Sequence, residues 1–380
     1  MSMSVIDPRT AILLVGIMSG LMSLVLYQLK RNYPASIKGL GQWSAALFVI
    51  FFGGLLAAGH GKIPELFTTA IPNFLLCSGV YLLYAGTQRF YGVTPHPWPW
   101  MTLITGVMLA SMWFIWVEPN YTARLRLVTM TMASLFLVHA WLVFRQGLAT
   151  FARVLAFGVL VVISAIQLMR LVTTFTLPMG NDILDPTPHH AAFVASFSFC
   201  LLLFSISTVL MASDRLHTEL EHLATHDSLT DALTRRHMNE ACQTELARCH
   251  RHGRSMALLM MDLDHFKAIN DTYGHQTGDR VLINFAAKVR VLLRQPDQLG
   301  RFGGEEFVVL LPETSLEEAV AVAERIRAAC ALASAQPTCT VSIGITTNQK
   351  DIDTMDTLLA RADAAMYRAK ALGRDRVEAA

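Results

Sequence analysis

The chain has 380 residues, of which 53% are hydrophobic and 16% are charged, a charged share well below the roughly 25% of ordinary soluble domains. The 213 residues before Asp214 hold 11 basic and 5 acidic residues, whereas the 167 residues from Asp214 onward hold 20 basic and 24 acidic residues. This division excludes a single soluble globule, a collagen-like chain and a disordered chain. The net negative charge of the second half argues against a nucleic-acid-binding surface there.

Seven apolar stretches in the first half are long enough to cross a bilayer, which takes about 20 residues each. Polar breaks separate them, and they span approximately residues 10–29, 42–59, 68–87, 99–117, 126–144, 153–172 and 192–212. We therefore expect residues 1–212 to form an all-α, polytopic membrane domain that acts as a sensor or anchor. If the N-terminus lies outside, the cytoplasmic loops hold slightly more lysine and arginine than the outer loops do. This is the usual bias of membrane proteins, and it favours that orientation.

Within the expected spans, His139 and Arg170 are candidates for function. Ionisable groups at membrane depth are costly and often mark functional sites. The alternative is structural: His139 bonds a serine or threonine on a neighbouring helix, and the long Arg170 side chain reaches the interface. The six cysteines form no CxxC pair and are expected to be reduced thiols.

Residues 213–226 join the two halves and carry Leu216, Leu220 and Leu223 at spacings of four and three. This spacing predicts a short helical seam that continues out of the last span and pairs with a second copy as a parallel coiled coil. The alternative is that these leucines pack on their own soluble domain.

From residue 227 to 380, apolar strand patterns alternate with amphipathic helix patterns, which predicts a layered α/β (α+β) domain. Helices are expected at 237–252, 280–294, 315–332 and 355–372. Strands are expected at 256–263, 299–303, 305–311 and 338–347, with a short strand near Val377. The sequence contains neither a P-loop nor a Rossmann fingerprint.

The first strand of this domain is apolar and ends in Asp262-Leu263-Asp264. Carboxylates held at the end of a buried strand suit a hard divalent cation. Lys267 and Asn270 follow in the segment that leaves the strand, where they are placed to offset phosphate charge and to contact a base edge.

The sequence Gly303-Gly304-Glu305-Glu306 lies between two strand patterns, which predicts a hairpin turn with a positive φ angle at glycine. Adjacent like charges at a hairpin tip are unfavourable without a compensating ion. Together with Asp262, Glu305 would complete a site for two Mg²⁺ ions, the arrangement that activates an attacking hydroxyl and stabilises a phosphoryl leaving group. The alternative is an exposed acidic hairpin with no ligand.

Residues from about 222 to 380 resemble the GGDEF-domain diguanylate cyclases. The opening residues His226-Asp227-Ser228-Leu229-Thr230 and the GGEEF hairpin carry the resemblance, as does the closing segment from Ala362 to Arg374. Asp231 and Thr234 depart from the usual opening motif. The resemblance implies a fold similar to the palm of nucleotide cyclases and the condensation of two GTP into cyclic di-GMP and two pyrophosphates.

The resemblance also implies roles for individual residues. Asp262, the Leu263 carbonyl and Glu305 would bind two Mg²⁺ per GTP, with Mn²⁺ as the alternative metal and Glu306 as a further ligand or base. Lys267 would stabilise transition-state charge. Guanine would lie among Asn270, His275 and Asp279. Lys370 and Arg374, four residues apart on one expected helix face, would hold the triphosphate.

Arg294 and Asp297 form an RxxD motif just before the hairpin. The motif is similar to the inhibitory site of this family, where bound cyclic di-GMP contacts the arginine and aspartate. Arg325 stands where a second arginine often contributes.

The twofold symmetry of the product implies a homodimer with one half-site in each domain. Because GTP is cytoplasmic, the resemblance places the catalytic domain in the cytoplasm and the spans in the bacterial inner membrane. The main alternative is a non-catalytic receptor that binds cyclic di-GMP through Arg294 and Asp297. A third reading, a transporter with an attached regulatory domain, is disfavoured because no pair of broken spans indicates inverted repeats.

Overall fold

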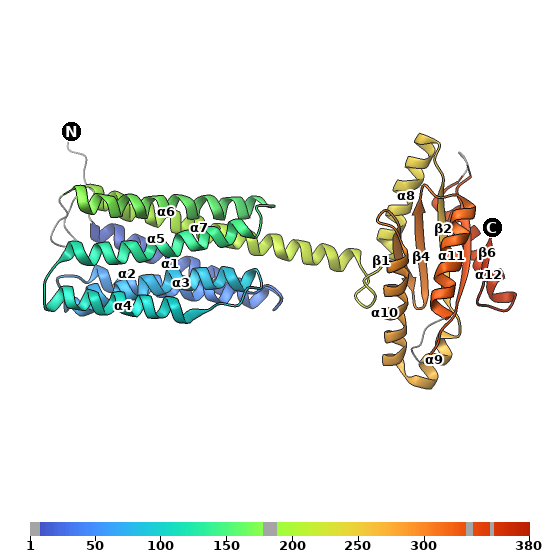
Figure 1. The fold of residues 1–380 in the computed structure, drawn as a ribbon, viewed down its shortest axis with the longest axis horizontal. Coiled ribbons are helices and arrows are strands. Elements are labelled where there is room, and N and C mark those ends of the chain that lie inside the picture. Colours follow the sequence, from blue (N-terminus) through green and yellow to red (C-terminus); the bar gives the residue numbers. More distant parts are fainter. Residues whose placement is uncertain (1–7, 178–187, 332–336, 350–352) are drawn as a thin grey trace. The chain divides into compact units, whose positions relative to one another are not determined.

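A computed structural model describes residues 8–177, 188–331, 337–349 and 353–380 (Figure 1). The chain divides into two compact units, Met1–Thr218 and Glu219–Ala380.

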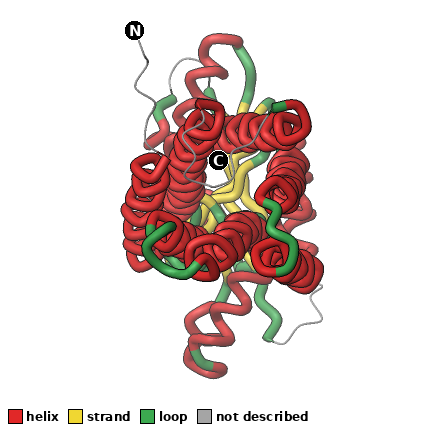
Figure 2. Tube along the Cα trace, turned by 90° about the vertical axis from the view of Figure 1, so that its left-hand side faces the viewer, coloured by secondary structure: helices red, strands yellow, loops and turns green. Residues whose placement is uncertain are grey.

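Helices dominate the first unit, as the colouring by secondary structure in Figure 2 shows. They are α1 (Pro8–Asn32), α2 (Leu40–Ala58), α3 (Ile71–Phe90), α4 (Pro97–Trp116), α5 (Tyr121–Arg145), α6 (Phe151–Thr176) and α7 (Pro188–Thr225). A π-helical turn, η1 (Leu66–Ala70), leads into α3. In the described part of the chain, seven helices are long and apolar enough to cross a membrane, which agrees in number with the seven predicted spans.

The core of this unit joins α2, α3 and α5 through a few polar contacts among apolar side chains. Trp43 is fully buried, and its indole N–H lies 3.2 Å from both the Leu83 carbonyl and the Thr87 hydroxyl. His139 is also fully buried, with Nε2 2.8 Å from the hydroxyl oxygen of Thr87. The structural interpretation of His139 is therefore supported, because its partner is a threonine on a neighbouring helix.

The predicted connector is helical, because α7 continues without a break to Thr225. Leu216 packs against the core of the bundle, whereas Leu220 and Leu223 are 54% and 59% exposed. The exposed pair does not support the alternative that the leucines pack on their own soluble domain. Pairing of this stripe with a second copy remains a prediction.

The second unit is built on a six-stranded sheet in the order β1-β3-β4-β2-β5-β6. Its strands are β1 (Leu233–Thr234), β2 (Met256–Leu263), β3 (Gln298–Gly303), β4 (Glu306–Pro312), β5 (Val341–Thr347) and β6 (Val377–Ala379). The central strand β2 runs antiparallel to both β4 and β5 and is buried along its whole length.

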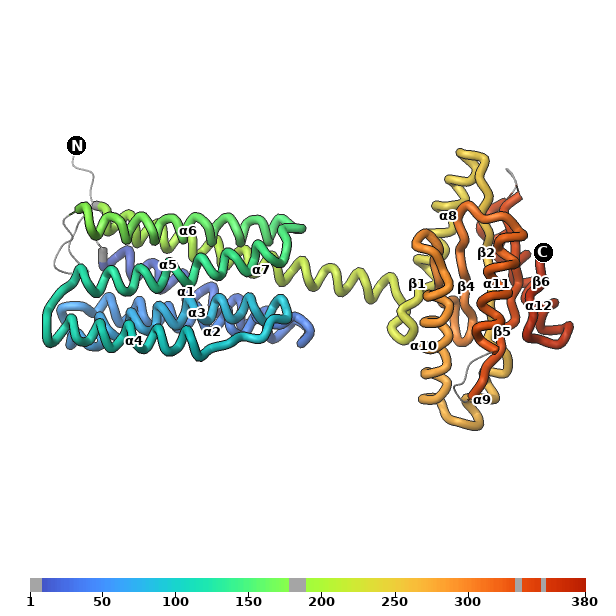
Figure 3. Tube along the Cα trace, in the orientation of Figure 1, coloured from blue at the N-terminus to red at the C-terminus, as the bar shows by residue number. Residues whose placement is uncertain are grey.

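Helices cover both faces of this sheet (Figure 3). Leu259 and Met261 pack with α10 (His275–Leu292) and α11 (Leu316–Ala331), whereas Leu258 and Met260 pack with α8 (Arg235–His252) and α12 (Met355–Ala371). A short helix, α9 (Phe266–Tyr273), leads from β2 to α10. Because alternate residues of β2 face opposite layers of helices, the strand appears in the sequence as a continuous apolar run.

The predicted strand at 256–263 is confirmed, and each of the four predicted helices is present with shifted ends. Helix α10 begins five residues before the predicted 280, and α12 ends at Ala371 rather than at residue 372. The strand predicted at 338–347 begins at Val341. The short elements β1 and α9 were not predicted, because two strand residues or two helical turns carry too little periodicity to stand out.

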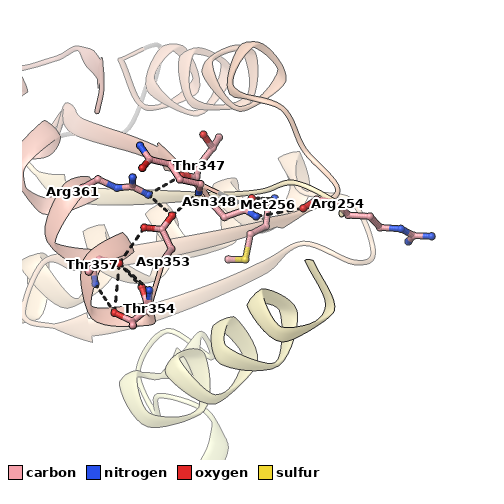
Figure 4. Close-up of polar contacts among 9 residues, drawn as sticks. Arg254, Met256, Thr347, Asn348, Asp353, Thr354, Thr357 and Arg361 are labelled. Atoms are coloured by element: carbon pink, nitrogen blue, oxygen red, sulfur yellow. Dashed lines mark hydrogen bonds and ion pairs between the residues drawn. The ribbon is translucent and has the colours of Figure 1, made fainter. Parts of the chain in front are cut away.

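The start of α12 is fixed to the end of β5 by the polar cluster shown in Figure 4. Asp353 lies 2.8 Å from the guanidinium of Arg361, which also donates to the Thr347 carbonyl at 2.9 Å. Thr357 donates to Asp353 at 3.1 Å, and Thr354 caps the helix by accepting from the Thr357 backbone N–H. These bonds set where α12 begins on the sheet.

Gly344 allows α12 to lie directly on β5. A Cβ atom at this position would collide with the backbone at Ala362 and Met366 of α12. Met366 is one helical turn before Lys370, so this close approach determines how far Lys370 stands from the end of β2.

We predict that Gly344→Ala destabilises the second unit, by about 1–3 kcal/mol, because an added methyl group overpacks a rigid backbone contact. Urea unfolding of residues 219–380 measures the effect. Gly303→Ala is the matched control, since its Cβ would meet nothing within 4 Å. Equal stability of the two variants would contradict the close packing of α12 on β5.

Candidate active site

The site forms where the β3–β4 hairpin meets the end of β2. Gly304 has a φ of +41° at the hairpin tip, and the register shifts between Arg301 and Gly303. Asp262 pairs directly with Glu306 across the β2–β4 ladder. The Leu263 backbone N–H points to the Glu305 carbonyl, with N and O 3.4 Å apart. The fold therefore brings Asp262, Leu263, Glu305 and Glu306 together, as the sequence predicted.

Asp262 is the buried member of this group. Its side chain is 9% exposed, and one carboxylate oxygen lies 2.8 Å from Nζ of Lys370. Burial raises the pKa of the Asp262 carboxyl, the Lys370 ammonium lowers it, and the charges of Glu305 and Glu306 raise it, so that the pKa ends above its ordinary value. One ammonium does not balance three carboxylates.

This excess of negative charge is the property that a divalent cation would neutralise. Carboxylate and carbonyl oxygens are also the ligands that Mg²⁺ and Mn²⁺ prefer, so the chemistry of the donors fits such an ion. Among the residues that the structure describes, however, no three histidine, cysteine or acidic side chains converge closely enough to form a metal-binding cluster. These acidic residues supply the negative charge and the oxygen ligands that a divalent cation needs. Lys370 contacts one carboxylate oxygen of Asp262.

Asp264, two residues further along, has a structural role. Its two carboxylate oxygens accept hydrogen bonds from the hydroxyls of Thr340 and Ser342, both at 2.7 Å, and from the Asp375 backbone N–H at 3.1 Å. Asp264 therefore joins the end of β2 to the start of β5 and to the segment before β6. The two aspartates of the DLD sequence thus differ. Asp264 has hydrogen-bond donors at both carboxylate oxygens, whereas Asp262 has the Lys370 ammonium at one of them.

The residues predicted to contact guanine lie around the α9–α10 junction. Gly278 faces the side-chain oxygen of Asn270 so closely that a Cβ atom there would collide with it. Asp279 follows directly and is exposed in the first turns of α10, as is His275. Asn270 and Asp279 are therefore close neighbours. Lys267 is exposed on α9.

The expectation that Lys370 and Arg374 share one helix face is wrong. Helix α12 ends at Ala371, and Arg374 lies in the following turn with a φ of +62°. Its backbone N–H closes the helix end by donating to the Ala369 carbonyl at 3.1 Å. Gly373, one residue earlier, has a φ of +116° and ends the helix, a signal that the sequence did contain.

The three residues of the predicted product site meet at the C-terminal end of α10. Asp297 accepts from the Arg294 backbone N–H at 2.8 Å, and its other carboxylate oxygen is buried without a hydrogen-bond partner. Arg325, from α11, donates to the Leu292 carbonyl at 2.8 Å. Arg325 therefore contacts the end of α10, two residues before Arg294, and the role of the three residues in product binding stays a prediction.

Arg301, which was not predicted as a functional residue, connects the hairpin to the opening loop of the unit. Its guanidinium lies 2.9 Å from Asp227 and donates to the Gly304 carbonyl at 2.7 Å. Burial disfavours the charged form of Asp227, but hydrogen bonds from Thr230 and Arg301 outweigh burial and hold its pKa below the ordinary value. The position of Arg301 directly before Phe-Gly-Gly was the available signal.

We predict that Asp262→Asn raises the free energy of unfolding at pH 7. A carboxyl with a raised folded-state pKa costs stability as pH rises from its unfolded value of about 3.9 through the folded value, and asparagine removes that cost. Urea unfolding of residues 219–380 without divalent cations, at pH 4 and pH 7, measures the effect.

The matched control is Asp264→Asn, which should destabilise the unit by about 1–3 kcal/mol because a carboxamide cannot accept from both hydroxyls. A loss of stability in Asp262→Asn as large as that of Asp264→Asn would contradict the charge excess.

Comparisons with known proteins identify the second unit. A family model described as diguanylate cyclase, GGDEF domain, matches residues 224–376. Diguanylate cyclase DgcP of Pseudomonas aeruginosa is 45% identical over 172 residues, covering 43% of this chain and 26% of that protein. Diguanylate cyclase DgcM of Escherichia coli K12 is 43% identical over 171 residues, covering 44% of this chain and 41% of that protein.

Among solved structures, the GGDEF domain of DgcB from Caulobacter crescentus in complex with c-di-GMP is 32% identical. The match covers 41% of this chain and 93% of that one, with a TM-score of 0.39. This chain thus spans less than half of the length of the two curated relatives. Residues 224–376 therefore match the family model of the GGDEF-domain diguanylate cyclases, and the same region is similar to two proteins named as such.

Proposed function

We propose that the protein is a membrane-bound diguanylate cyclase that condenses two GTP into cyclic di-GMP and two pyrophosphates. The observation that carries the proposal is the pairing of Asp262 with Glu306 beside Glu305, within a GGEEF hairpin. The sequence match to proteins named diguanylate cyclases supports the same activity.

The metal site proposed is formed by Asp262, the Leu263 carbonyl, Glu305 and Glu306, which would hold Mg²⁺, or Mn²⁺ as the alternative. Such ions supply positive charge that stabilises a phosphoryl leaving group. Lys370 already contacts Asp262 at 2.8 Å, so its ammonium is placed to contact a phosphate bound at these carboxylates. Two of the expected triphosphate contacts, Lys370 and Arg374, therefore come from α12 and from the turn after it.

The base site proposed lies at the α9–α10 junction. A carboxylate at Asp279 accepts from the N1–H and N2–H₂ groups of guanine, which adenine lacks, and Asn270 beside it bonds the same edge. His275 lies one turn earlier on α10. Lys267, exposed on α9, is placed to stabilise charge that develops on the phosphates.

The reaction requires two such units. In each half-reaction the 3′-hydroxyl oxygen of one GTP bonds to the α-phosphorus of the other, and the bond to pyrophosphate breaks. Glu306, exposed at the start of β4, is proposed to accept the hydroxyl proton. The product has twofold symmetry, so a homodimer that brings two half-sites face to face provides the geometry and the effective concentration.

The first unit is proposed to anchor and regulate the catalytic unit. The seven long apolar helices in the described residues of this unit suit the bacterial inner membrane, with the catalytic unit in the cytoplasm and the N-terminus outside. The exposed stripe of Leu220 and Leu223 on α7 is the proposed dimer seam. Two short heptads are weak alone, but anchoring in one membrane raises their effective concentration.

Product inhibition is proposed at Arg294, Asp297 and Arg325. The Asp297 carboxylate would accept from guanine, and arginine guanidiniums bind phosphates bidentately. Strand β3 lies between this site and the carboxylates of the hairpin.

We predict that Glu305→Gln lowers cyclic di-GMP formation by at least ~100-fold, because it removes a charge that a metal-assisted phosphoryl transfer requires. The assay uses the full-length protein in detergent with GTP and Mg²⁺, and product is quantified by chromatography. Glu313→Gln, an exposed glutamate just past the other end of β4, is the control. If the two variants lost equal activity, or if the wild type formed no product, the proposal would be wrong.

We predict that Arg294→Ala weakens inhibition by cyclic di-GMP, because it removes a charge-assisted contact. The concentration of cyclic di-GMP needed to halve the variant's own uninhibited rate should rise by about tenfold or more. The measurement is the initial rate of pyrophosphate release at increasing product concentration. Arg248→Ala, an exposed arginine of α8, should behave as the wild type does. Unchanged inhibition in Arg294→Ala would exclude this residue from the inhibitory site.

A further inference from the structure

The first unit contains a cavity of about 170 Å³ at the end of the bundle where α1, α5 and α7 begin and where α2 and α6 end. The residues of α7 that line the cavity lie more than four helical turns before residue 212, where α7 continues into the connector. Apolar side chains from five helices form most of the wall: Ile12, Val15, Ile50, Leu76, Val128 and Phe197.

Two arginines interrupt this apolar wall, Arg124 of α5 and Arg170 of α6. The Nε atom of Arg124 is buried and has no hydrogen-bond partner. A guanidinium nitrogen of Arg170 lies 3.4 Å from Nδ1 of His190, and its carbon lies 5.9 Å from the ring centre of Phe193. The cavity therefore combines a small apolar volume with two guanidinium groups.

The described residues that line the cavity include no carboxylate. Before Asp214, the acidic residues in the described ranges are Glu65 and Glu118, and neither lines it. No ion pair joins Arg124 or Arg170 to another described residue. Cationic groups held in an apolar environment without a counter-charge are costly and often mark binding sites.

Arg126, two residues from Arg124 on the same helix, has hydrogen-bond acceptors for its guanidinium group. It donates to the Thr174 hydroxyl at 3.1 Å and to the Thr174 carbonyl at 2.7 Å, and its guanidinium lies 3.9 Å from the ring centre of Phe175. Arg126 thus ties α5 to α6 and does not line the cavity. Arg124, by contrast, lies 5.8 Å from the ring centre of Tyr121 and has no hydrogen-bond partner at Nε, which leaves that nitrogen for a ligand.

We propose that this cavity binds a small organic anion, a carboxylate on a compact apolar body. The planar guanidinium groups of Arg124 and Arg170 match a carboxylate bidentately, and Gln167 adds a polar group to the wall. The volume is comparable to the ~150 Å³ of an engineered cavity that admits benzene, which sets the size of the apolar body at one ring or a short alkyl chain.

A ligand at this position contacts α7 directly, because His190, Val194 and Phe197 belong to the wall. Helix α7 continues to Thr225, so the site lies on the helix that leads into the connector. An anionic head group of a phospholipid offers the same charge as a small carboxylate, and the experiment separates the two sources.

The test measures the thermal unfolding temperature of the full-length protein in uncharged detergent with increasing benzoate, and benzyl alcohol serves as the uncharged analogue. We expect benzoate to raise the unfolding temperature in a saturable way, with benzyl alcohol far weaker. The apparent Kd for benzoate should rise about tenfold or more in Arg124→Gln. It should stay at the wild-type value in Arg126→Gln, which removes the same charge two residues away.

Val194→Phe provides a second variant, because it fills the apolar part of the cavity without changing a charge and should also weaken benzoate binding. Equal effects of benzoate and benzyl alcohol, or equal losses in Arg124→Gln and Arg126→Gln, would overturn the proposal. In a parallel sample without benzoate, vesicles of phosphatidylglycerol replace the detergent. Stabilisation by those vesicles alone, lost in Arg124→Gln, would identify the anion as a lipid head group and overturn the small-ligand assignment.

Discussion

The pairing of β2 with β4 is the constraint on which the candidate active site depends. Antiparallel register places Asp262 directly opposite Glu306 and leaves Glu305 at the adjacent turn. Side chains of directly paired residues lie on the same side of a sheet. The backbone hydrogen bonds between β2 and β4 therefore keep the two carboxylates close to each other. Lys370 is the nearest counter-charge, and it leaves the group negative.

Contacts from neighbouring elements fix the surroundings of these carboxylates. Gly344 lets α12 approach β5 closely enough for Lys370 to contact Asp262, while Arg301 holds the hairpin to the opening loop through Asp227. Asp264 uses its carboxylate to join strand ends. The site is thus a region of uncompensated charge inside a rigid frame, which is a general device for preparing a charged reaction.

Much of this arrangement could be predicted from the sequence. The apolar run of β2, the paired glycines and the seven long apolar helices are strong local patterns, and they predicted the layers, the hairpin and the group of acidic residues. The ion pair of Lys370 with Asp262 could not be predicted, because it depends on a backbone approach at Gly344, 26 residues before Lys370 and on another element. The short strand β1 depends on tertiary contacts in the same way, whereas the exit of Arg374 from α12 had a local signal in Gly373.

We propose that Asp262, Glu305 and Glu306 together form a site whose negative charge favours the binding of divalent cations. Electron paramagnetic resonance of Mn²⁺, titrated into residues 219–380 with a non-hydrolysable GTP analogue, measures this most directly. The account predicts saturable Mn²⁺ binding in the wild type that is lost in a Glu305→Gln, Glu306→Gln double variant. Mn²⁺ binding of equal affinity in the two proteins would contradict it.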